Sequence, residues 1–225
     1  MPSYTVRRAP ATPEFIGNWD GPVWSAAETA QVASFHPKGS DHRPATAVKA
    51  LYDDRGIYIH FRVEDRYVRC LGTRPMDPVY RDSCVEFFVQ PTPGGGYLNV
   101  EANCGGAFLC LYIEDARKLP GGAFAKSRPL APEWFGEIRT FHSLPSVVEP
   151  ELPGPVTWQL EYFIPFALLE SCAGPLGVAA GQTWRGNFYK CGDETSRPHW
   201  GAWSPIGEPL NFHQPGCFGE IVFAP

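Results

Sequence analysis

The residues that could bind a polar ligand or transfer a proton are concentrated in one stretch, residues 77–103. Two runs in it, 85–90 and 97–103, alternate between polar and apolar side chains. Because successive side chains of a strand point to opposite faces, a period of two collects the polar ones on one face. That face would carry the carboxylates and amides of Glu86, Asn99, Glu101 and Asn103, together with the ring of Tyr97. Such a set suits binding of a polar ligand.

The same two runs form the elements that position these side chains. Their other positions are apolar, namely Val85, Phe87 and Val89 in the first run and Leu98, Val100 and Ala102 in the second. Gly94–Gly96 allows the chain to turn between them. The pattern predicts a β-hairpin with one apolar face and one polar face.

Further alternating segments predict an all-β chain. The clearest strand is Ile57–Glu64, joined by the turn Asp53–Gly56 to a strand over Thr46–Tyr52. Other predicted strands are Ala107–Ile113, Phe135–His142, Thr157–Ile164, Thr183–Lys190 and Phe218–Phe223. Residues 1–18 are expected to be an extended lead-in, residues 114–135 a mostly irregular loop, and residues 165–169 a single helical turn that begins at a proline.

Composition supports this architecture. The 24 prolines and 23 glycines among 225 residues suit many short strands joined by turns. With 44% hydrophobic and 19% charged residues the chain can bury a sizeable core. We therefore predict an all-β fold, a single-domain antiparallel β-sandwich over residues 1–225, with its core at about 18–223, long loops and little helix.

Charge and hydropathy exclude several partners. The formal net charge is −5 and no Lys/Arg cluster is present, so no nucleic-acid partner is expected. No apolar run approaches the roughly 20 residues of a membrane span, so no membrane partner is expected. The first residues lack the apolar core of a secretory signal, which predicts a cytoplasmic protein, or a secreted or periplasmic one if a leader has been removed.

The seven cysteines are an odd number and include no CxxC pair. This spacing disfavours a zinc cage. Free, buried thiols in a reducing compartment are favoured over disulfides.

Several short motifs occur in a fixed order along the chain. They are Asp20-Gly21 with Trp24, then Leu51–Ile59 (LYDDRGIYI), Asp82–Phe88 (DSCVEFF), Glu161–Phe166 (EYFIPF), Trp203–Pro205 (WSP), Asn211–Pro215 (NFHQP) and Phe218–Ile221 (FGEI). Together they resemble the family 9 carbohydrate-binding modules and the stand-alone family 9-like proteins, which belong to a wider group of DOMON-like, immunoglobulin-like β-sandwiches. The resemblance covers about residues 18–223.

The resemblance implies a sugar held on a concave, aromatic-lined face, between two aromatic clamps. Tyr80 and Phe212 occupy the positions of the family's two clamp tryptophans, so both clamps stay aromatic. The motif glutamate corresponds to Glu86. A family arginine falls near Asn99, or at Glu101 with a shift. Some members bind structural calcium, but the resemblance assigns no calcium ligands here, and no other cofactor is predicted.

Neighbouring residues complete the candidate site. Arg81 follows Tyr80, while Asn211 and His213 flank Phe212. Lys190 and Asn187 lie on the penultimate predicted strand, from which either could reach the ligand, and Trp134 in the long loop could be a movable aromatic. Each has a structural alternative, such as an ion pair of Glu86 with Arg81 or Arg62, a solvated face for Asn99, Glu101 and Asn103, or a core position for a large aromatic.

The predicted function is non-catalytic binding of a mono- or oligosaccharide, or of a glycan end, with micromolar to millimolar affinity. One alternative is a haem-binding redox module that uses Met76 and His213 as axial ligands. Another is a glycoside hydrolase that pairs Glu86 with Glu101 or Asp82. No phosphate loop, GxSxG elbow or HExxH motif indicates any other chemistry.

Overall fold

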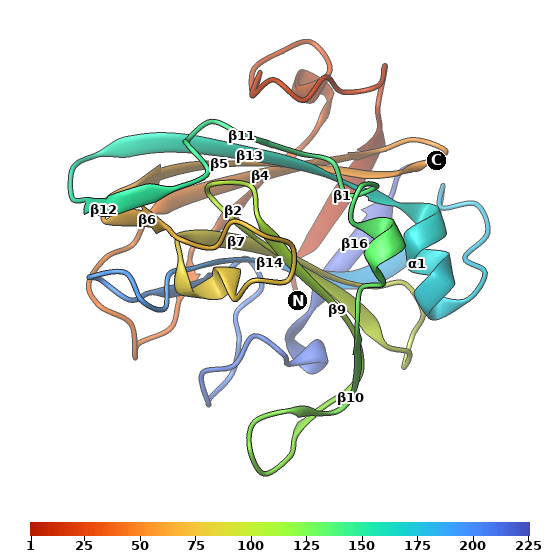
Figure 1. Cartoon of the computed structure of the whole chain (residues 1–225). Helices are drawn as coiled ribbons and strands as arrows, with labels where there is room; N and C mark the ends of the chain where they lie inside the picture. Colours follow the sequence, from red (N-terminus) through yellow and green to blue (C-terminus); the bar gives the residue numbers. More distant parts are fainter.

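The computed structural model describes residues 1–225 and shows a β-sandwich of two curved layers (Figure 1). The strands run in the order β10-β9-β8-β7-β14-β16-β1-β4-β5-β13-β11. One layer contains β7 (Cys84–Gln90), β8 (Tyr97–Asn103), β9 (Phe108–Lys118), β10 (Phe124–Pro129), β14 (Thr183–Cys191) and β16 (Gly219–Phe223). The other contains β2 (Thr29–Val32), β4 (Ala45–Tyr52), β5 (Gly56–Asp65), β11 (Thr140–His142) and β13 (Val156–Pro165). The predicted all-β sandwich is confirmed.

Strand β1 (Ser3–Arg8) links the two layers. Ser3–Val6 pair in parallel with β16, and Arg7 and Arg8 pair in parallel with β4. The prediction of a mere lead-in was therefore incomplete. Pro2 and Pro10 flank this strand rather than interrupt it, and its partners are distant in sequence, so no local hairpin signal marks it.

The core lies between the layers. Phe61 of β5 and Phe188 of β14 meet across it with ring centroids 6.2 Å apart. In the hairpin of β7 and β8, Val85, Phe87 and Val89 point into this core and are almost completely buried. The alternation of these side chains therefore places Cys84, Glu86 and Phe88 on the opposite, outer face of β7.

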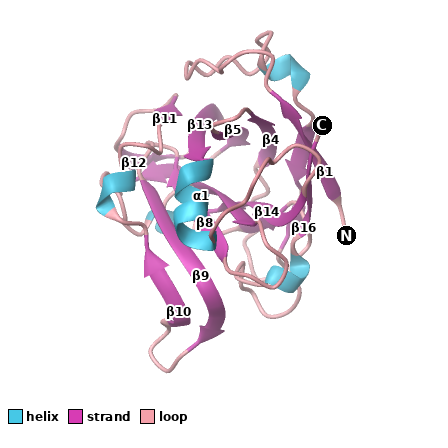
Figure 2. Cartoon of the chain, turned by 90° about the vertical axis from the view of Figure 1, so that its right-hand side faces the viewer, coloured by secondary structure: helices cyan, strands magenta, loops and turns pink.

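One helix covers an open end of the sandwich. α1 (Phe166–Ala173) begins after Pro165 and buries Leu168 and Leu169 in the main core. It lies in front of the space between the layers in Figure 2. The helix is longer than the single predicted turn, and Pro165 precedes it instead of being its first residue. None of the helices has the length and apolar character that crossing a membrane requires.

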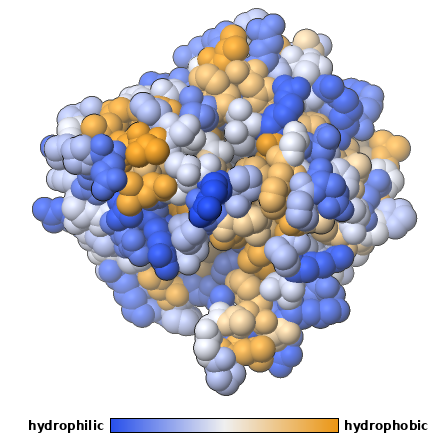
Figure 3. All heavy atoms as spheres, viewed as in Figure 1, coloured by the Kyte–Doolittle hydropathy of each residue, from blue (hydrophilic) through white to orange (hydrophobic).

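The hairpins agree with the predictions, with two corrections. The predicted hairpin is confirmed, since β7 pairs with β8, and the register places Glu86 opposite Glu101. However, the long loop predicted at 114–135 is wrong, because β9 continues to Lys118 and pairs with β10. The tip of this hairpin projects from the body of the molecule (Figures 1 and 3). The strand predicted over Phe135–His142 is reduced to Thr140–His142 by a 3-10 turn at Pro132–Trp134 and a turn that follows it.

Three short pairings complete the fold. β15 (Trp200–Ala202) adds to β14 and in turn pairs with β3 (Ser34–Phe35). β6 (Val68–Cys70) and β12 (Val148–Leu152) form a separate two-stranded sheet. β15 matters most for function, since it brings Trp200 to the outer face of the layer that carries Glu86.

Candidate functional site

A pocket of about 430 Å³ opens on the outer face of the layer that contains β7 and β8. Its size falls within the range typical of small-ligand sites, roughly 300–1,000 Å³. Five aromatic rings line it, those of Tyr80, Phe124, Trp200, Phe212 and His213. Its polar lining comes from Glu86, Glu101, Lys118, Asp193 and Asn211, and the remaining lining from Leu109, Leu111, Cys191 and Leu210.

Two carboxyl groups form the floor of the pocket. Glu86 and Glu101 are direct partners in the β7–β8 ladder, so their side chains emerge side by side. They are only 3% and 5% exposed, respectively. No lysine or arginine forms a salt bridge with either one, which rules out the expected structural ion pair of Glu86 with Arg81 or Arg62. Lys118 is near enough to Glu101 to favour its ionised form but forms no salt bridge with it, so the two buried acids need another explanation.

The hydrogen bonds of this floor are incomplete. Asn99 Nδ2 donates to Glu101 Oε1 at 2.7 Å, and Glu101 Oε2 has no partner. Cys191 Sγ donates to Glu86 Oε1 at 3.2 Å. Burial, with the negative charge of Asp193 nearby, raises the pKa of Glu101 to about 8. Burial and the nearby Cys191 and Glu101 raise the pKa of Glu86 well above its ordinary value. Both groups therefore tend to keep a proton and could donate hydrogen bonds to a ligand.

One wall of the pocket is held together by Asp193. Its Oδ1 accepts a hydrogen bond from Trp200 Nε1 at 2.7 Å, and its backbone N–H donates to the carbonyl of Tyr80 at 3.1 Å. These two bonds fix the turn after β14 against the 3-10 turn Val79–Arg81. Tyr80 and Trp200 therefore belong to one rigid assembly, and each ring is partly exposed.

The opposite wall comes from the loop before β16. Phe212 stacks on Tyr189 with ring centroids 4.2 Å apart and an angle of 14° between the planes. His213 Nδ1 lies 2.9 Å from the hydroxyl of Tyr97, and its ring packs edge-on against Phe124. Burial, with Lys118 nearby, lowers the pKa of His213 to about 3, so this ring is neutral at physiological pH.

Comparison with known proteins identifies this arrangement. The sequence model of carbohydrate-binding family 9 matches residues 25–223. The chain belongs to carbohydrate-binding family 9. This confirms the resemblance drawn from the motifs, and with it the assignment to carbohydrate binding. A search among curated protein sequences gives no match.

Solved structures share the family 9 fold. A Bacteroides uniformis protein proposed to bind carbohydrate is 29% identical, with a TM-score of 0.84 and 98% of each chain covered. A family 9 module from Caldicellulosiruptor kristjanssonii in complex with cellotriose is 15% identical, with a TM-score of 0.60, covering 99% of this chain and 94% of that one. A second structure of a family 9 module from that organism, in complex with glucose, has 14% identity and a TM-score of 0.56, with 97% and 95% covered.

The structure brings together six of the ten predicted site residues, namely Tyr80, Glu86, Glu101, Asn211, Phe212 and His213. Sequence reasoning did not select Asp193, Lys118, Phe124 or Trp200 as site residues. Asp193 and Trp200 could have been sought as an acid–aromatic pair after β14. Lys118 and Phe124 were hidden in the segment predicted to be irregular.

Lys190 is placed elsewhere. It lies on the face of β14 that points into the sandwich, it is fully buried, and its Nζ lies 3.4 Å from Asp65 Oδ2. The alternation along β14 shows that Lys190 and Cys191 face opposite sides. Asn187 does not line the pocket either, because its amide is bonded to the backbone of Ser204.

Three other predicted residues do not line the pocket. Asn99 is fully buried and accepts a hydrogen bond from the Leu111 N–H while holding Glu101. Asn103 bonds to the carbonyl of Gly72 and to Asp82, so it shapes a loop. Arg81 points away and pairs with Glu194, with N–O distance 3.4 Å.

The structure does not support three other sequence-based hypotheses, which concern a movable tryptophan, a haem site and a catalytic aspartate. Trp134 lines a second, smaller pocket and packs against the main core, so it is not a movable ring over the floor. Met76 packs against the main core, whereas His213 packs on the outer face of the sheet, so the two do not form an axial pair for haem. Asp82 accepts the backbone N–H groups of Leu71 and Gly72, which gives it a structural role.

The calcium of some family members finds no matching side-chain cluster here. One group of three potential ligands lies close enough to hold a cation, and it offers two sulfurs and one carboxylate. Calcium takes six to eight oxygen ligands, so this donor set does not fit it. The seven cysteines are all free thiols, as predicted.

The raised pKa of Glu101 predicts a pH-dependent stability. Below the ordinary value of 4.5 the group is protonated in both the folded and the unfolded chain. Between 4.5 and about 8 only the unfolded chain loses the proton, so the free energy of unfolding falls as pH rises, by up to about 1.4 kcal/mol per pH unit. Urea denaturation between pH 5 and 8 should show this contribution as the difference between the wild type and Glu101→Gln, because buried histidines with lowered pKa values, such as His199 and His213, change the pH dependence of both proteins equally.

A matched control is the exposed Glu220, on the same layer. Glu220→Gln should keep the slope of the wild type. If Glu101→Gln also kept the full slope, Glu101 would not be the group that holds its proton in the folded state.

Proposed function

We propose that the pocket between Tyr80, Trp200 and Phe212 binds the carbohydrate, and that it does so without catalysis. The observation that carries this proposal is the convergence of five aromatic rings on two buried carboxyl groups in one pocket. Sugars present flat apolar faces of C–H groups and a rim of hydroxyls, which match aromatic rings and planar polar groups, respectively.

The carboxyls also argue for binding rather than hydrolysis. A glycoside hydrolase needs environments that drive two carboxyl pKa values apart, so that one acid stays protonated while its partner is ionised. Here burial raises the pKa of Glu86, Glu101 and Asp193 alike. None of the three carboxyl groups has a lowered pKa that would keep it ionised while another stays protonated, and this supports a binding role.

The dimensions favour a small ligand or the end of a chain. Most of a ligand of one or two sugar rings would be enclosed in about 430 Å³, and the partly exposed rings of Tyr80 and Trp200 leave one side open for a longer glycan. Two family 9 structures from Caldicellulosiruptor kristjanssonii contain cellotriose and glucose, so glucose and its β-linked oligomers are the first ligands to test.

Calorimetric and NMR titration with glucose, xylose and their oligomers tests the proposal. We expect dissociation constants between about 1 μM and 1 mM for at least one sugar. Borohydride-reduced oligomers should bind more weakly if a ring at the reducing end enters the pocket. If no glycan gives either heat or NMR shifts, binding is refuted. Steady release of reducing sugar that is lost in Glu86→Gln would refute the absence of catalysis.

A further inference from the structure

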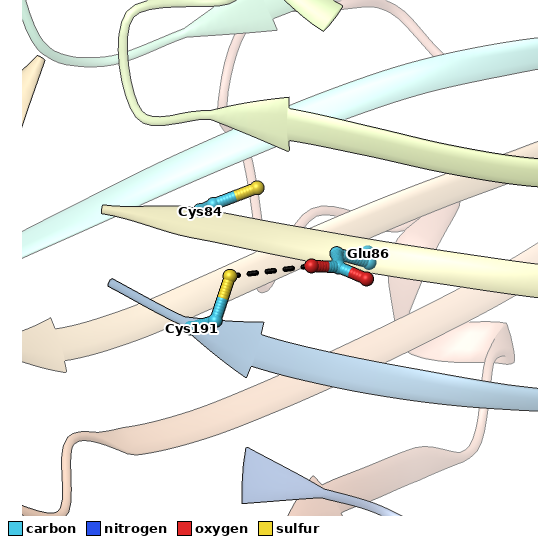
Figure 4. A group of neighbouring side chains, drawn as sticks. All are labelled: Cys84, Glu86 and Cys191. Atoms are coloured by element: carbon cyan, nitrogen blue, oxygen red, sulfur yellow. Dashed lines mark hydrogen bonds between the residues drawn. The ribbon is translucent and has the colours of Figure 1, made fainter. Parts of the chain in front are cut away.

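Three potential metal ligands meet beside the floor of the pocket (Figure 4). Cys84 and Glu86 project from β7, and Cys191 projects from β14. Their two Sγ atoms and a carboxylate oxygen all lie within 4.8 Å of one another, and all three side chains are buried. In Figure 4 the thiol of Cys191 points toward the carboxylate of Glu86, to which it donates a hydrogen bond at 3.2 Å.

The ladder register explains why these groups converge. Cys84 is the direct partner of Cys191 in the β7–β14 pairing. Glu86 lies two residues after Cys84, on the same face and diagonal to Cys191. Glu86 and Cys191 lie on two strands and are 105 residues apart, so the site has no CxxC spacing by which the sequence could indicate it.

The surroundings of the cluster are acidic. Glu101 faces it from β8 with an oxygen that has no hydrogen-bond partner, and Asp193 approaches from the turn after β14. Lys190, the nearest lysine in sequence, points to the other face, where its ammonium bonds to His199 and pairs with Asp65. Lys118 lies on the pocket wall, with its Nζ 3.3 Å from the centre of the Phe124 ring, and its charge offsets part of the rise in the pKa of Glu101. A bound cation would compensate this concentration of acids and thiols.

We propose that Cys84, Glu86 and Cys191 bind a zinc ion. Two sulfurs and a carboxylate select a borderline-soft cation over calcium or magnesium, which prefer oxygen ligands. Zinc bond lengths of about 2.3 Å to sulfur and about 2.0–2.2 Å to oxygen place tetrahedral ligands roughly 3.5–3.8 Å apart. In the structure, Cys191 Sγ lies 3.2 Å from Glu86 Oε1, and no two of the three ligand atoms are more than 4.8 Å apart.

The site supplies three ligands, the number found where zinc keeps one position for an outside ligand. Glu86 and Cys191 also line the carbohydrate pocket, so the pocket is the entry path for the ion. The proposal concerns metal binding by the chain alone and does not depend on which sugar the pocket accepts.

Zinc binding must displace protons. Burial raises the pKa of Cys84 to about 12, and burial also raises that of Cys191 and Glu86 well above their ordinary values. Thiolates are the metal ligands, so each zinc ion releases two thiol protons, plus that of Glu86 when it is protonated. The apparent affinity should therefore rise at least about 100-fold per pH unit between pH 6 and 8.

The test uses the full chain, freed of metal by a chelator and kept reduced with a phosphine. Titration with zinc against a chromophoric chelator should give one site, with a dissociation constant below about 1 μM at pH 7.5. Titration with Co²⁺ should produce a thiolate-to-metal absorption band. Calcium should compete with neither ion.

Variants locate the site. Cys84→Ser and Cys191→Ser should each weaken zinc binding at least about 100-fold, and Glu86→Gln should weaken it to a smaller degree. The matched controls Cys172→Ser and Cys217→Ser, at half-buried thiols outside the cluster, should leave it unchanged. Circular dichroism checks the fold, and Cys84→Ala offers a second replacement where serine disturbs the core.

Measurements on the wild type and on the control variants can each overturn the proposal. No binding tighter than about 100 μM, no thiolate band, or equal loss of zinc in the control variants would each refute it. A sugar titration of the chelated protein separates the two proposals. Sugar binding that persists while zinc binding fails refutes only the metal site, and the converse refutes only the sugar site.

Discussion

Replacing Trp200 with alanine is expected to weaken carbohydrate binding by about 10- to 100-fold, roughly 1.4–2.8 kcal/mol. The indole lines the pocket, and its hydrogen bond to Asp193 fixes the ring before any ligand arrives. Little conformational entropy is therefore lost when a sugar stacks on it. Calorimetric titration with the best-bound sugar measures the change.

Two matched variants interpret this result. Trp200→Phe retains a ring and should keep most of the affinity. Trp134→Ala removes a tryptophan from the second pocket and should bind as the wild type does. If Trp134→Ala lost affinity while Trp200→Ala kept it, the ligand would occupy the second pocket.

Replacing Lys190 with methionine is expected to destabilise the fold by about 3–5 kcal/mol. The ammonium is fully buried, donates to the carbonyl of Cys191 at 2.9 Å and to His199 Nε2 at 2.8 Å, and lies 3.4 Å from Asp65. Burial and the nearby Lys190 lower the pKa of His199 to about 3, so its neutral ring can accept this bond. Removing the lysine leaves the buried carboxylate of Asp65 without its ammonium partner.

Urea denaturation at pH 7 measures this loss, and a second substitution tests its origin. Lys190→Met combined with Asp65→Leu removes both charges and should recover part of the stability. Carbohydrate affinity of the folded variants should remain that of the wild type. If stability were unchanged and carbohydrate affinity fell strongly, Lys190 would be a binding residue and not a structural one.

The pattern of side chains predicted much of this molecule. Alternation in residues 85–90 and 97–103 correctly placed Glu86, Asn99, Glu101 and Asn103 on one face of a hairpin, because a two-residue period determines which side chains share a face. Motif order placed Tyr80 and Phe212 in one pocket although 132 positions separate them. Hydrophobic periodicity and family motifs are both properties of the linear chain, so they can be recognised before folding is known.

The errors have a common physical source. Both faces of β14 are buried, so the alternation at Lys190 and Cys191 could not show which residue faces the core and which faces the pocket. Asp193 and Trp200 come together only through the turn that joins β14 to β15. The hairpin of β9 and β10 extends into a polar, glycine-containing segment, in which exposed strands have few apolar residues to reveal them.

The parallel pairing of β1 with β16 has a consequence for synthesis. Ser3 pairs with Glu220, and β16 lies between β14 and β1 in the middle of the strand order. While the ribosome is still making residues 219–223, both β14 and β1 present unpaired edges, and such edges favour association with other chains. We therefore expect the two halves of the sandwich to close only after the last strand emerges, and a nascent chain that stalls before it to be especially prone to aggregation.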